Sequence, residues 1–98
     1  MTTQSDAIKA ARKIVGSIHY TGGSHTFNVL DAGANAWREG RHYRSLARAQ
    51  AYRNRAIAAR ALVALGANRI QAHCLVINET GSAAEIVARL ADQIAEDA

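Results

Sequence analysis

The longest uninterrupted segment of this sequence, between Ser45 and Gly66, is the feature that most constrains the fold. It contains neither proline nor an internal glycine. Serine is favoured at the start of a helix, and glycine is favoured just beyond its last turn. We therefore predict one long helix from Ser45 to about Leu65. The 98 residues are enough for one domain, residues 1–98, with one modest hydrophobic core.

Apolar spacing and turn residues predict three further elements before this helix. A first helix, capped by Thr3 or Ser5, ends near Gly16. The segments 17–21 and 25–31 alternate as strands do, and Gly22-Gly23-Ser24 between them is typical of a tight hairpin. On this hairpin Ile18 and Tyr20 should share one face, as should Phe27 and Val29.

Residues 36–44 predict a third strand, bent at Gly40, although a helix over 34–44 is a competing interpretation. We prefer the strand because Trp37 and Tyr43 suit a sheet. The segment 69–78 contains the continuous apolar run 74–77, which is typical of a strand buried on both faces.

The last part of the chain predicts a helix that begins at a capping box. Ser82 and Glu85 have the spacing of this motif. One apolar face follows along the helix: Ile86, Val87, Leu90, Ala91 and Ile94. The expected fold class is α+β, with a small, mainly antiparallel sheet of three to four strands, helices packed on one face, and the order α-β-β-β-α-β-α.

The basic charge of the chain is concentrated in its centre. Residues 34–69 contain eight arginines and one glutamate, a net charge of +7, whereas residues 70–98 have a net charge of −4. On the long helix, Arg48 and Arg55 should share one stripe and Arg53 and Arg60 another. The candidate binding residues are Arg38, Arg41, Arg44, Arg48, Arg53, Arg55, Arg60 and Tyr43.

These residues predict a non-enzymatic binding module that contacts nucleic-acid phosphates, with Tyr43 or Trp37 as a stacking surface. Guanidinium groups bind phosphate or carboxylate in a bidentate manner. An alternative is a small inhibitor or adaptor, of the kind found among phage or mobile-element accessory proteins that block a host defence complex. Such a protein would dock the same arginines on an acidic partner. A third interpretation is structural, with solvated arginines that pair with the acidic C-terminal helix.

The layout of residues 5–65 resembles that of a double-stranded-RNA-binding domain. A helix precedes a strand, Gly-Gly-Ser-His forms the loop, Phe27 opens the next strand, and Ser45 begins an alanine-rich helix. The lysine cluster of that family would fall on Leu46 and Ala47, and the proline of its loop motif is missing. The resemblance is therefore one of layout, without the residues that grip phosphate.

Other chemistry has little support in the sequence. His73 and Cys74 are adjacent, so on a strand they would point to opposite faces, and no zinc-ligand spacing is present. Ser24, His25 and Asp31 have the residue types of a catalytic triad but lie within one hairpin. We therefore expect no enzymatic activity, no metal and no cofactor.

The cysteine content, the apolar runs and the terminal helix indicate the cellular compartment and the oligomeric state. Cys74 is the single cysteine and is expected to be a small buried hydrophobic residue. No apolar run is long enough to cross a membrane, and no signal-type stretch opens the chain, so we expect a cytoplasmic protein. The terminal amphipathic helix could also dock to a second copy, which makes a homodimer an alternative to a monomer.

Overall fold

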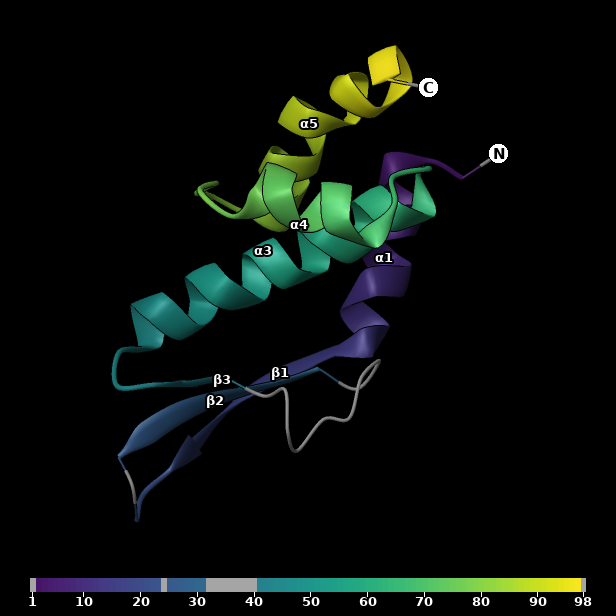
Figure 1. Ribbon diagram of the computed structural model, residues 1–98. Helices are drawn as coiled ribbons and strands as arrows, with labels where there is room; N and C mark the ends of the chain where they lie inside the picture. Colours follow the sequence, from purple (N-terminus) through teal and green to yellow (C-terminus); the bar gives the residue numbers. More distant parts are fainter. Residues whose placement is uncertain (1, 24, 32–40, 98) are drawn as a thin grey trace.

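The computed structural model describes residues 2–23, 25–31 and 41–97 (Figure 1). Within this part of the chain the protein is a mixed α+β molecule and is mostly helical. It has four helices and a small antiparallel sheet. The elements are, in order, α1 (Gln4–Ile14), β1 (Val15–Thr21), β2 (Thr26–Asp31), β3 (Arg41–Tyr43), α3 (Leu46–Ala64), α4 (Arg69–Val76) and α5 (Ala83–Asp97).

Helix α1 continues directly into the first strand. The Thr3 side chain caps the helix by accepting a hydrogen bond from the Asp6 backbone N at 3.1 Å. Ala7, Ile8 and Ala11 bury one face. The predicted stop at Gly16 is two residues late, because α1 ends at Ile14 and the backbone is already extended at Val15.

Strands β1 and β2 form the predicted hairpin, and their register confirms the predicted faces. Ile18 pairs with Val29 and Tyr20 pairs with Phe27, so these four side chains lie on the same face of the sheet. A bulge interrupts the register between Val15 and Ile18. The short β3 adds three residues beside β2, with Tyr43 opposite Phe27.

Helix α3 is the centre of the molecule and confirms the element predicted from Ser45 to Leu65. The Ser45 side chain caps it, and the helix packs against α1, α4, α5 and each of the strands. Ile57 and Leu62 are fully buried where the helices meet. Gly66 ends the helix with φ of 121°, a conformation in which glycine has no Cβ penalty.

The predicted strand over 69–78 is wrong, because this segment forms helix α4. The Asn68 side chain caps the helix by accepting from the Gln71 backbone N at 2.7 Å. Ala72 and Val76, four residues apart, are buried against the core, whereas Cys74 is exposed. A short apolar run fits a buried helix as well as a strand, so the run alone does not decide between them. The expectation that Cys74 is buried is wrong for the same reason.

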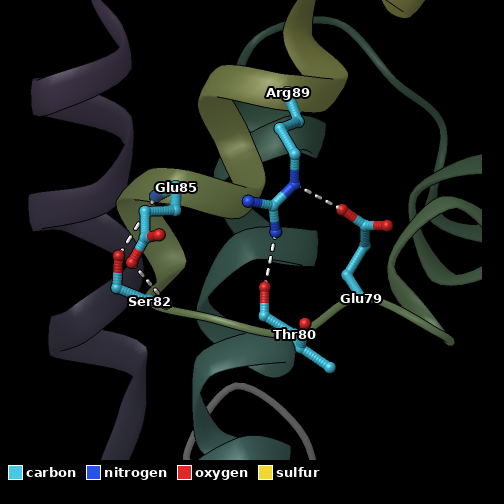
Figure 2. A network of polar contacts seen from close by, with 5 residues as sticks. All are labelled: Glu79, Thr80, Ser82, Glu85 and Arg89. Carbon is cyan, nitrogen blue, oxygen red and sulfur yellow. Dashed lines mark hydrogen bonds and ion pairs between the residues drawn. The ribbon is translucent and has the colours of Figure 1, made fainter.

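Helix α5 confirms the predicted capping box (Figure 2). The Ser82 backbone N donates to Glu85 Oε1 at 3.2 Å, and the Glu85 backbone N donates to Ser82 Oγ at 3.1 Å. Arg89 joins the preceding turn to the helix: its Nε lies 3.0 Å from Glu79 Oε1, and its Nη2 donates to the Thr80 carbonyl. Of the predicted apolar face, Ile86, Val87, Leu90 and Ile94 are buried and Ala91 is half-buried.

The sheet is smaller than the expected three to four strands, and the described part of the chain is mostly helical. The sheet is built on the two-stranded hairpin, only Arg41–Tyr43 pairs beyond it, and the sixth element is helical, which gives the order α-β-β-β-α-α-α. Most of the expected strand over 36–44, including Trp37, lies outside the described residues. Figure 1 places the helices on one side of the sheet, as predicted.

Candidate functional site

The predicted arginines separate onto different sides of α3. Arg48, Tyr52 and Arg55 follow one another at i, i+4 and i+7, so they form a single line along the helix. We call these three residues the α3 stripe. Arg48 is exposed and Arg55 is half-buried. Arg44, just before the helix, is also exposed.

Arg53 has a structural role and is not part of the α3 stripe. Its Nε donates a hydrogen bond of 3.0 Å to the Gly16 carbonyl oxygen, between residues 37 positions apart. Gly16 lies inside the bulge of β1, where the ladder between the strands is interrupted. Arg53 therefore ties α3 to the first strand. Arg60 is half-buried and also has an interaction partner within the protein.

The remaining predicted arginines lie in or before β3. Arg38 is outside the described residues. The backbone of Arg41 is paired with Val29 of β2. The structure thus brings Arg44, Arg48 and Arg55 to the start and one side of α3, and it separates Arg53 from them.

Tyr43, the predicted aromatic contact, is part of a line of four rings. Tyr20, Phe27 and Tyr43 are successive cross-strand partners on the inner face of the sheet. The ring centroids of Tyr20 and Phe27 are 5.1 Å apart, and those of Tyr43 and Tyr52 are 5.8 Å apart. We call Tyr20, Phe27, Tyr43 and Tyr52 the aromatic row. It joins the hairpin to the α3 stripe, because Tyr52 belongs to both.

Sequence reasoning named Tyr43 as a site residue and missed Tyr20, Phe27 and Tyr52. Phe27, Tyr43 and Tyr52 are half-buried, with part of each side chain packed against the core. Tyr20 differs, because 57 % of it is exposed. The signal that could have found the row is the hairpin register, because the pairing of Tyr20 with Phe27 across the turn puts the two rings on one face.

The exposed Tyr20 ring is held in position near the hairpin turn. Its hydroxyl is hydrogen bonded to His25 Nδ1 at 3.1 Å, and its ring packs against Phe27. His25 itself has a φ of 52°, which is uncommon for a residue other than glycine. A hydrogen bond and a ring contact together restrict the rotamers of a side chain that would otherwise move freely in solvent.

The charge around the α3 stripe is uniformly positive along the helix. Helix α3 contains four arginines and no acidic residue. The side chains of Arg44, Arg48 and Arg55 form no hydrogen bond or ion pair with the part of the chain that the structure describes. Their positive charge is therefore available to an external anion.

A separate depression of about 450 Å³ lies between β1 and α3. Its lining consists of Ser17, Ile18, Gln50, Arg53 and Asn54, and it contains no carboxylate, imidazole or thiol. Among residues 2–23, 25–31 and 41–97, no three His, Cys, Asp or Glu side chains are grouped as a metal site would require. Ser24, one member of the triad considered above, lies outside the described residues.

The outer face of α4 is unexpectedly apolar. Ile70 is 79 % exposed and Ile77 is 54 % exposed, with the Cys74 thiol also in solvent between them.

Within the described chain, no helix is both long enough and apolar enough to span a bilayer. Comparison with models of known families, with curated proteins and with solved structures gives no match.

Proposed function

We propose that this protein is a binding module for nucleic acid and that Arg44, Arg48 and Arg55 contact the phosphate groups. The observation that supports this function best is the absence of internal partners for these three guanidinium groups within the described chain. Guanidinium donors match phosphate oxygens in a bidentate manner. A helix with four arginines and no acid also attracts polyanions from solution.

The position of the arginines favours a backbone contact. Arg48 and Arg55 lie on one line along α3. Arg44 lies just before the helix, between β3 and the N-cap Ser45. Consecutive phosphates of a nucleic acid form a similar line of negative charge. Each arginine that neutralises a phosphate releases counterions, so the affinity should decrease steeply as salt is added.

The first test is to measure binding of labelled single- and double-stranded DNA and RNA at two salt concentrations by fluorescence anisotropy. We expect tight binding at low salt that is lost at higher salt. The double variant Arg48→Gln/Arg55→Gln should weaken binding at least tenfold and lower the slope of log affinity against log salt by roughly one per arginine.

The matched control removes the same charge elsewhere. Arg12 and Arg69 are exposed arginines on α1 and α4, so Arg12→Gln/Arg69→Gln should leave most of the affinity and of the salt slope intact. Equal losses in the two double variants would mean that net charge, and not this surface, drives binding. No binding of any nucleic acid at low salt would contradict the proposal.

A protein-binding adaptor or inhibitor is the second candidate, and the apolar face of α4 favours it. Ile70 and Ile77 are exposed large hydrophobic residues, which are enriched where proteins meet other proteins. In this case the arginines would dock on an acidic surface of the partner. Absence of nucleic-acid binding at low salt would leave this candidate in place.

A further inference from the structure

We infer that the nucleic acid bound by this protein is single-stranded and that its bases stack on the aromatic row. This inference rests on the proposed function, because it assigns a role to the rings beside the arginines. The row is built from Tyr20, Phe27, Tyr43 and Tyr52, which come from three strands and one helix. Tyr20, at one end of the row, is exposed, whereas the other three rings are half-buried between the sheet and α3.

The row has the length of a short run of nucleotides. Tyr20, Phe27 and Tyr43 are cross-strand partners in β1, β2 and β3, and the ring centroid of Tyr52, from α3, is 5.8 Å from that of Tyr43. With neighbouring strands about 4.8 Å apart, the three strand positions extend over about 10 Å, which corresponds to roughly three or four stacked nucleotides at about 3.4 Å each.

Tyr20 is the member of the row best placed to stack on a base. More than half of its surface is in solvent, while the bond from its hydroxyl to His25 and the contact with Phe27 hold the ring. An ordered ring loses little conformational freedom on binding, so a larger part of the stacking energy contributes to affinity. An exposed tyrosine without such contacts would lose more.

Tyr52 connects stacking with phosphate binding. It lies between Arg48 and Arg55 on the α3 stripe, and its ring contacts Tyr43. Single-stranded nucleic acid is bound in other proteins by this combination, in which a basic surface follows the backbone and aromatic side chains receive successive bases. The proposed strand therefore has its phosphates beside Arg48 and Arg55 and a base on the exposed Tyr20 ring at the end of the row.

Duplex nucleic acid fits this surface less well. In a duplex each base is stacked between its neighbours, so its flat face is not available to a protein ring unless the stack is opened. An unpaired strand offers these faces at little cost. The rings therefore favour an unpaired strand, whereas the arginines alone would accept either form.

The decisive experiment compares three labelled probes of equal length: oligo-dT, an abasic strand with the same phosphates but no bases, and a duplex. Fluorescence anisotropy is measured with the wild-type protein and with Tyr20→Leu, which keeps an apolar side chain against Phe27 but has no ring. We expect the wild type to bind oligo-dT more tightly than the abasic strand. Tyr20→Leu should bind oligo-dT about 5- to 150-fold more weakly, with the salt slope unchanged.

Two control variants make the result specific to the ring. Tyr20→Phe keeps the ring and its contact with Phe27 but removes the hydroxyl bonded to His25, so it should lose much less affinity than Tyr20→Leu. Ile70→Ala removes an exposed apolar side chain from α4, away from the row, and should have no effect. Circular dichroism melting of each variant shows whether the hairpin remains folded.

The outcomes separate this inference from the proposed function. If oligo-dT, the abasic strand and a duplex bind equally and Tyr20→Leu changes nothing, the arginines bind phosphate and the stacking inference is overturned. If a duplex binds more tightly than oligo-dT, the inference of a single strand is overturned as well. If none of the probes binds, the proposed function itself is wrong.

Discussion

At the scale of single residues, Glu85 makes the start of α5 sensitive to acid. The backbone N–H of Ser82 bonds to its carboxylate, and with the Ser82 side chain and nearby Arg89 this lowers the pKa of Glu85 below its ordinary value of 4.5. A lowered pKa in the folded state means that the stabilisation is complete above the unfolded pKa. It is lost as the pH falls through the folded pKa.

We therefore expect Glu85→Gln to reduce the dependence of stability on pH below about 4.5, because glutamine keeps an acceptor for the Ser82 N–H but does not titrate. The measurement is the urea midpoint of unfolding at neutral and acidic pH for wild type and variant. The wild type should be the more stable protein at neutral pH, and the two should converge in acid. Parallel pH profiles would contradict a role of the Glu85 charge.

Arg48 and Arg53 lie on the same helix but have different environments. Arg53 donates to the Gly16 carbonyl and joins α3 to β1, whereas the exposed Arg48 side chain has no partner in the described chain. In the sequence, Arg48 and Arg53 look like two equivalent binding residues, because both are arginines of the same helix. The difference arises from the bulge in β1, which presents a carbonyl group to one side of the helix.

At the scale of elements, the helical conformation of α4 can be tested, because it buries Val76 and exposes the adjacent Ile77. Val76 is 4 % exposed and Ile77 is 54 % exposed. Val76→Ala should lower the free energy of unfolding by about 2 kcal/mol, because two buried methyl groups are lost and a cavity remains. Ile77→Ala, the matched control, should cost less than about 0.5 kcal/mol.

Urea unfolding of both variants distinguishes a helix from a strand buried on both faces. In such a strand the two substitutions would be similarly costly, and Cys74 would be protected. In α4 the Cys74 thiol is in solvent, so a thiol reagent should modify it in the native protein. Slow modification that requires unfolding would contradict the helix.

At the scale of the whole molecule, charge is distributed unevenly over an elongated shape of 46 × 23 × 21 Å. The arginine-rich α3 packs against α1, which has three basic residues and one acidic residue. The acidic α5 ends far from the hairpin in Figure 1. Because like charges are neighbours in the folded state, repulsion should oppose folding when the solution contains little salt.

We expect the protein to become slightly more stable, by less than about 1 kcal/mol, when chloride salt is raised from about 0.01 M to about 0.15 M. Over this range the screening length decreases from about 30 Å to about 8 Å. Urea midpoints at the two concentrations measure the change. A loss of stability on adding salt would mean that attractive ion pairs dominate instead.

The local signals of the sequence determined much of the helical framework and of the hairpin. Ser45, Gly66 and the Ser82–Glu85 capping box act on backbone groups within a few residues, so their effect does not depend on the rest of the fold. The alternation in β1 and β2 likewise follows from the period of two in any strand.

Only the tertiary structure decided the conformation of residues 69–76 and the composition of the candidate site. A short apolar run is compatible with a helix or a strand, and here packing of Ala72 and Val76 against the core accompanies the helix. The exposure of Arg48, the internal bond of Arg53 and the contact between Tyr43 and Tyr52 all depend on where α3 crosses the sheet. These contacts join residues distant in the chain, so no local pattern of the sequence contains them.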